Sequence, residues 1–126
     1  MHFEVGWDDP NQTVIVVVMR EGWDWGDYFV AVNQTYDMIR DVNHKVDVII
    51  SGAVLRIPRG DMLSQLRKIR KLRPENMGEL VLVGVNTFVR SIAGAFGRVY
   101  RNTVPVYFAD SVREARSILK QARVAS

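Results

Sequence analysis

The chain contains no cysteine, and this absence excludes disulfides, thiol nucleophiles and thiolate metal sites. Histidine is almost absent too. His2 and His44 each stand alone on their segments, without the second histidine at short spacing that a metal site uses. Neither histidine lies where it could serve as the base of a serine hydrolase. We therefore expect no metal and no cofactor, and no enzymatic activity.

Long hydrophobic runs are also missing. The longest, residues 13–19 and 80–85, fall far short of the roughly 20 residues needed to cross a bilayer. The first five residues, Met-His-Phe-Glu-Val, have no basic stretch leading into the apolar core of a secretory signal. We expect a cytoplasmic protein without a transmembrane segment.

The residues that are present suit a folded domain with an uneven charge. A chain of 126 residues, 48% hydrophobic and 25% charged, predicts a single domain over residues 1–126. Residues 56–73 hold seven basic residues against one acid, a net charge of +6. The rest holds ten basic and thirteen acidic residues, a net charge of −3. A mildly acidic body therefore carries one basic segment.

Three apolar segments run directly into polar helix starts, a pattern that predicts a parallel α/β sheet. These segments are residues 46–50, 80–85 and 106–108. Ligands of such sheets gather beyond the carboxyl ends of the strands. The residues at these three ends are our candidate ligand site: Ser51, Gly52, Asn86, Thr87, Asp110 and Ser111.

Residues 2–7 and 13–20 read as two more strands, joined by a turn over 8–11 into an antiparallel hairpin. Asp24, Asp61 and Ser111 are predicted helix caps, and Pro74 ends the second helix after about residue 72. A further helix is predicted over 88–100. The fold class is thus α/β, with a five-stranded mixed sheet and about four helices.

Two local features leave alternatives open. Trp23 and Trp25 at a helix entrance either staple that helix to the sheet, the reading we favour, or form an exposed aromatic contact. Gly94 and Gly97 lie inside a predicted helix, where each costs up to about 1 kcal/mol relative to alanine. Close packing on the sheet or the lining of a ligand pocket would compensate for them.

Four segments together resemble the bacterial STAS-like proteins, and more narrowly the SpoIIAA-like branch related to CRAL-TRIO lipid carriers. They are Trp23-Asp-Trp-Gly-Asp-Tyr-Phe29, Val46-Asp-Val-Ile-Ile50, Val83-Gly-Val-Asn-Thr-Phe-Val-Arg90 and Phe108-Ala-Asp-Ser-Val-Arg-Glu-Ala115. The resemblance covers nearly the whole chain. It implies a five-stranded mixed sheet with helices and no enzymatic activity.

The chain departs from that family at one position. Its anti-sigma-factor antagonists carry a phosphorylatable serine where the helix after the third strand begins. Here the stretch reads Pro58-Arg-Gly-Asp-Met62, and the nearest hydroxyl, that of Ser64, lies inside the predicted helix. Ordinary capping explains Asp61, and imitation of a phosphorylated state is the alternative.

The basic segment is the candidate partner site. Arg67, Lys68 and Arg70 have no acid three or four residues away to pair with, so an anionic partner would relieve their repulsion. A solvated helix face is the other reading. An acidic protein or anionic lipid fits, whereas nucleic acid is not expected, because no reading motif is present. The candidate residues are Arg56, Arg59, Arg67, Arg70 and Lys71.

Two functions remain as hypotheses. The first is a non-enzymatic regulatory or interaction module, a homodimer that presents residues 52–73 to an acidic partner. The second is a carrier of a small apolar or amphiphilic, lipid-like ligand beneath the glycine-bearing helix, with its headgroup near Ser51 and Asn86.

Overall fold

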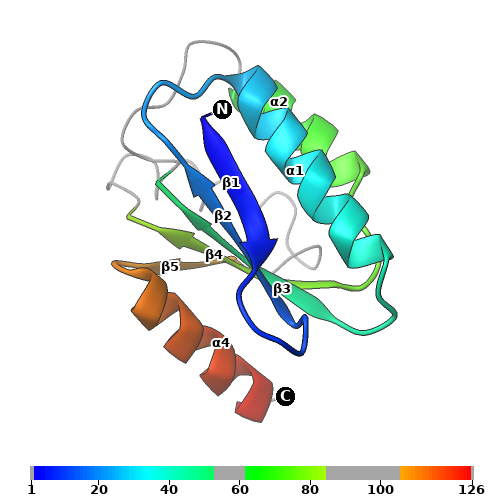
Figure 1. Cartoon of the computed structure of the whole chain (residues 1–126), viewed down its shortest axis with the longest axis vertical. Helices are drawn as coiled ribbons and strands as arrows, with labels where there is room; N and C mark the ends of the chain where they lie inside the picture. Colours follow the sequence, from blue (N-terminus) through cyan, green and yellow to red (C-terminus); the bar gives the residue numbers. More distant parts are fainter. Residues whose placement is uncertain (1, 53–61, 85–105, 126) are drawn as a thin grey trace.

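The computed structural model describes residues 2–52, 62–84 and 106–125, which form a five-stranded sheet covered by helices (Figure 1). The elements are β1 (Phe3–Trp7), β2 (Val14–Met19), α1 (Trp25–Arg40), β3 (Val46–Ser51), α2 (Met62–Lys71), β4 (Met77–Val83), β5 (Val106–Ala109) and α4 (Val112–Ala125). The predicted α/β class with a mixed sheet is confirmed. The described part contains three helices, and the predicted helix over 88–100 lies outside it.

The strands lie in the sheet in the same order as in the chain, from β1 to β5. β1 and β2 are antiparallel, and every later neighbour is parallel, as the hairpin and the three strand ends predict. The hairpin is closed by Asp9, whose carboxylate accepts the N–H of Thr13 at 2.8 Å and the N–H of Val14 at 3.0 Å.

Helices cover the two faces of the sheet unequally. α1 and α2 connect successive parallel strands that advance in one direction, and right-handed connections place both helices on the same face. α4 lies on the opposite face (Figure 1). Each face has its own apolar cluster. The first contains Phe3, Ile15, Val17, Ile39, Val48 and Ile50, and the second contains Val14, Ile49, Val81, Val83, Ala115 and Leu119.

The start of α1 confirms the predicted cap. The Asp24 carboxylate accepts the N–H of Asp27 at 2.7 Å, and the Asp27 carboxylate accepts the N–H of Asp24 at 3.1 Å. Trp23 is 7% exposed and belongs to the first apolar cluster. The half-buried Trp25 packs edge-on against it at 5.4 Å between ring centroids. The staple interpretation is therefore confirmed for Trp23.

β4 begins at Met77, three residues before the strand predicted over 80–85. The reason lies on the neighbouring strand, where the Asp47 carboxylate accepts the N–H of Glu79 at 2.8 Å. Gly78 packs so closely on Asp47 that a Cβ there would overlap its carboxylate. A strand start held by a side chain of another strand leaves no trace in the periodicity of residues 77–79.

Candidate functional site

The carboxyl ends of the parallel strands lie in one row across the sheet. Along this row the paired residues are Val18, Ser51, Val83 and Ala109. The structure therefore brings four of the six candidate ligand-site residues to one edge: Ser51, Gly52, Asp110 and Ser111. Asn86 and Thr87 lie outside the described residues.

Backbone dominates the centre of this edge. Gly52 has a φ of +80°, and a Cβ there would overlap the carbonyl oxygen of Met19. Gly84 has a φ of +75°, and its N–H donates to the carbonyl of Ala109 at 2.9 Å. Ser51 is half-buried beside them. Two strand ends therefore turn tightly here, with no side chain on either glycine.

Ser111 caps the start of α4 as the sequence predicts, and Glu114 completes the cap. The Ser111 hydroxyl accepts the N–H of Glu114 at 3.0 Å, and the Glu114 carboxylate accepts the N–H of Asp110 at 3.2 Å. These bonds satisfy backbone donors that a helix start leaves unpaired. The role that the structure shows for Ser111 is capping.

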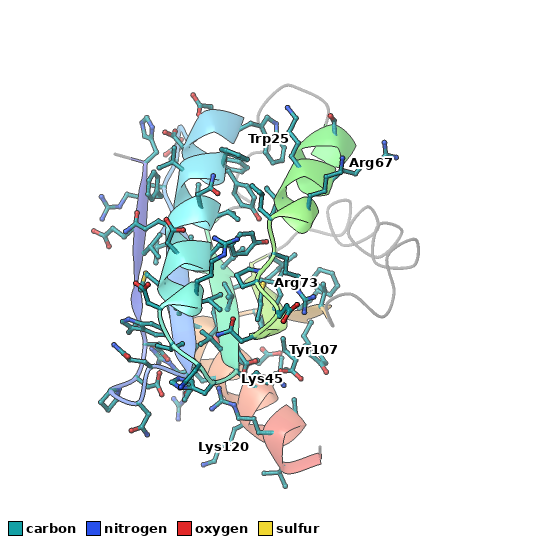
Figure 2. The ribbon with its side chains drawn as sticks, turned by 90° about the vertical axis from the view of Figure 1, so that its right-hand side faces the viewer. Trp25, Lys45, Arg67, Arg73, Tyr107 and Lys120 are labelled. Carbon is teal, nitrogen blue, oxygen red and sulfur yellow. The ribbon has the colours of Figure 1, made fainter. Side chains whose placement is uncertain are left out.

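The candidate partner site is partly described. Arg67 and Lys71 are exposed on α2, together with Lys68, and Arg67 points away from the body of the protein (Figure 2). On the same helix Ile69 packs against the first apolar cluster, so α2 turns one side to the core and Arg67, Lys68 and Lys71 to solvent. Arg70 lies within α2, but its side chain is not among those that the structure describes. Arg56, Arg59, Asp61, Gly94 and Gly97 lie outside the described residues.

Two further arginines adjoin the end of α2. The guanidinium of Arg40, from α1, donates to the carbonyl of Leu72 and to the Asp37 carboxylate at 3.3 Å. The guanidinium of Arg73 donates to the carbonyl of Met77 at 3.1 Å. Sequence reasoning on residues 52–73 missed Arg40, because only the contact between α1 and α2 brings it there.

A polar cluster at the opposite end of the strands was also missed. Asp47 is completely buried in β3, and its carboxylate accepts two hydrogen bonds from Arg123 of α4, from Nη2 at 2.8 Å and Nε at 3.1 Å. The Arg123 guanidinium also donates to the carbonyl of Thr13 at 3.0 Å. Beside them the ammonium of Lys45 lies 2.8 Å from the Glu79 carboxylate.

The pKa values of the two carboxyl groups in this cluster are shifted in opposite directions. Burial raises the pKa of Asp47, and the neighbouring Glu79 raises it further. Burial also acts to raise the pKa of Glu79, but hydrogen bonds with Asp47 and Lys45 outweigh it and lower that pKa. The sequence signal was a single aspartate inside the apolar run 46–50. A lone buried acid of this kind requires a cation, and Arg123 supplies it.

The chemistry available to the described residues is limited. Among residues 2–52, 62–84 and 106–125, no group of three or more histidine, aspartate or glutamate side chains is placed to hold a metal ion. A cavity of about 40 Å³ lies beneath α1 and α2, between Tyr28, Thr35 and Ile69. Pockets for small ligands start at about 300 Å³. This cavity therefore has no room for a lipid.

Comparison with protein-family models, with curated proteins and with solved structures finds no match to this chain. The resemblance to STAS-like proteins accordingly stays a prediction. Within the described residues, no helix has the length and apolar character needed to span a membrane.

Proposed function

We propose that this chain is a non-enzymatic interaction module of STAS type that binds an acidic protein surface through residues 52–73. The observation that carries the proposal is the exposed basic side of α2. Arg67, Lys68 and Lys71 are all solvent-exposed there, and α2 has no acid in its first turn. Ile69 holds this helix against the core, so its cations have a fixed position relative to the sheet.

Electrostatics supports an anionic partner. Lys68 and Lys71 lie three residues apart on α2 and form no ion pair with any residue in the described part of the chain. Like charges at this spacing repel each other. An acidic surface would relieve that repulsion, and the contrast between a basic segment and an acidic body would orient the approaching partner.

The test is the binding of a fluorescein-labelled, glutamate-rich peptide, followed by fluorescence anisotropy. In the double variant Lys68→Glu/Lys71→Glu we expect the Kd to rise by at least about tenfold at low salt, because two attractions become repulsions. Binding to the unmodified protein should weaken as salt is raised, since exposed charges are screened.

The matched control changes net charge equally at a distant place. Arg113 and Lys120 are exposed on α4, which covers the other face of the sheet. Arg113→Glu/Lys120→Glu should keep the Kd within about twofold. Equal loss in both double variants would show that net charge alone attracts the peptide, and unchanged binding in the α2 variant would remove α2 from the site.

The lipid carrier remains the alternative proposal. Its predicted lining, Gly94 and Gly97, lies outside the described residues, and the 40 Å³ cavity beneath α1 and α2 does not favour it. Native mass spectrometry of the purified protein tests it directly, because a carrier retains a small molecule whose mass adds to that of the chain.

A further inference from the structure

The outer edge of β1 has unpaired backbone groups. The N–H of Asp8 donates to the carbonyl of Val14 at 2.8 Å, and the N–H of Arg20 donates to the carbonyl of His2 at 2.7 Å. In an antiparallel pair, the residues bonded to the neighbour alternate with residues whose N–H and C=O point away. The even-numbered residues of β1 therefore bond to β2. Phe3, Val5 and Trp7 direct their backbone groups outward, where no described segment pairs with them.

Mainly apolar side chains line this edge, together with the polar Glu4 and Gln34. A groove of about 480 Å³ runs along β1, and Val5, Gly6, Val16 and Gln34 are among the residues that line it. Gln34 comes from α1, and Val30, one helical turn earlier on the same side, is 53% exposed. An unpaired strand edge with apolar surroundings is a template for pairing with another strand.

We propose that a second copy of this chain pairs with this edge, β1 against β1 in antiparallel orientation, to form a continuous ten-stranded sheet. The two copies are related by a two-fold axis at Val5, so that Val5 lies opposite Val5 of the other copy. Phe3 then lies opposite Trp7, and Glu4 lies opposite Gly6. Every outward N–H and C=O of Phe3, Val5 and Trp7 finds a partner in this register.

Charge selects this register and favours a second copy as the occupant. A slip of two residues one way places Glu4 opposite Glu4, and a slip the other way places Glu4 opposite Asp8. Like charges directly opposite each other destabilise a strand pair. The central register avoids both conflicts, because Gly6 carries no side chain. β1 is therefore self-complementary about Val5, as a two-fold interface requires.

This dimer involves β1 and not α2, so it stands or falls independently of the proposed binding of an acidic partner. Sedimentation of the purified protein should give twice the mass of one chain. A single-chain mass at every concentration tested would overturn the proposal.

Cysteine cross-linking locates the interface, since the chain has no cysteine of its own. Residues in a hydrogen-bonded antiparallel pair have Cα atoms about 5.5 Å apart, which a disulfide spans. Val5→Cys should therefore give a covalent dimer on mild oxidation. Glu4→Cys is the control, because the two Glu4 positions lie diagonally at more than about 7 Å. Its cross-linked yield should be at least about tenfold lower, and equal yields would overturn the register.

A pair of charge variants at Gly6 tests the same register without oxidation. No atom lies within 4 Å of a Cβ built at Gly6, so the folded monomer accepts a side chain there. Gly6→Glu places an acid opposite Glu4 and should weaken the dimer by about tenfold, whereas Gly6→Lys places a cation there and should strengthen it. Equal dimer affinities in two variants with wild-type circular dichroism would show that the two copies meet elsewhere and would overturn the proposal.

Discussion

Asp9 shows how much a single carboxylate contributes to the hairpin. It accepts hydrogen bonds from the N–H groups of Thr13 and Val14 and from the Thr13 hydroxyl. Burial acts to raise its pKa, but these bonds outweigh burial and hold the pKa below the ordinary value of an aspartate. Since the pKa is lower in the folded state, the ionised carboxylate stabilises the fold above its ordinary pKa. That contribution is lost as the pH falls through the folded pKa.

The variant Asp9→Asn should therefore lower the free energy of unfolding by about 1 kcal/mol at pH 7, because asparagine cannot accept both from the backbone and from the Thr13 hydroxyl. The difference from the unmodified protein should shrink when the pH is lowered to about 2. Urea unfolding at both pH values measures it.

Glu21→Gln is the control for this pH dependence. Glu21 is exposed and has no hydrogen bond or ion pair with a described residue. Its replacement should change the free energy of unfolding by less than about 0.5 kcal/mol at either pH. If the difference in free energy of unfolding between Asp9→Asn and the unmodified protein grew as the pH was lowered, the lowered pKa of Asp9 would be wrong.

At the scale of elements, the ends of β3 and β4 differ in how strictly they need glycine. Both Gly52 and Gly84 have positive φ angles. A Cβ at Gly52 would also overlap the Met19 carbonyl, whereas a Cβ at Gly84 meets nothing within 4 Å. The two positions therefore separate backbone strain from steric overlap.

We expect Gly84→Ala to lower the free energy of unfolding by about 1 kcal/mol, the cost of a left-handed backbone for a residue with a Cβ. Gly52→Ala should cost at least about 3 kcal/mol, because β2 and β3 must also move apart. Thermal or urea unfolding of the two variants compares them directly. Equal losses would mean that β2 and β3 separate at Gly52 without cost.

Local patterns predicted most of the elements, because their causes are local. The caps at Asp24 and Ser111 and the hairpin turn over residues 8–11 depend on side chains within a few residues of the backbone that they bind. The early start of β4 depends on Asp47, more than thirty positions away in the chain. No periodicity within 77–79 reports a contact at that distance.

At the scale of the whole molecule, hydrogen bonds from two arginines hold α4 against the sheet and the first hairpin. Arg116 donates to the Asp8 carboxylate from Nη2 at 2.7 Å and from Nε at 2.8 Å, and Arg123 donates to Asp47 and Thr13. These bonds join the last helix to the first hairpin and to β3. Leu119 and Ala115 bury the apolar side of the same helix.

A double-mutant cycle measures how strongly the ion pair between Asp47 and Arg123 stabilises the fold. Asp47→Asn should lower the free energy of unfolding by about 2 kcal/mol, because it removes a buried carboxylate that accepts two charged hydrogen bonds. Arg123→Gln should cost a similar amount, because it leaves the buried Asp47 carboxylate without the cation that compensates it. We expect a coupling energy of about 1 kcal/mol between the two sites.

Arg113→Gln provides the comparison within the same helix. Arg113 is exposed on α4 and should show a coupling to Asp47 of less than about 0.5 kcal/mol. A coupling for Arg123 no larger than that for Arg113 would show that the packing of Leu119 alone holds α4.

The candidate site was predictable only in part, for a physical reason. Positions on one element, such as the cations of α2, share a side because of helical spacing, and four strand-end residues meet because parallel strands end at one edge. The Asp47 and Arg123 pair joins residues far apart in the chain, and only the folded arrangement of α4 on the sheet brings them together.

The agreement between chain order and sheet order has a consequence for synthesis on the ribosome. Every described residue of the first apolar cluster and of the side chains packed on it lies between Phe3 and Leu82. Each strand docks on the one made just before it, so this half of the molecule can assemble while the remainder is still being translated. The second apolar cluster needs Ala115 and Leu119. Of the described helices only α4 contributes to this cluster, so the cluster stays incomplete in the nascent chain until α4 emerges.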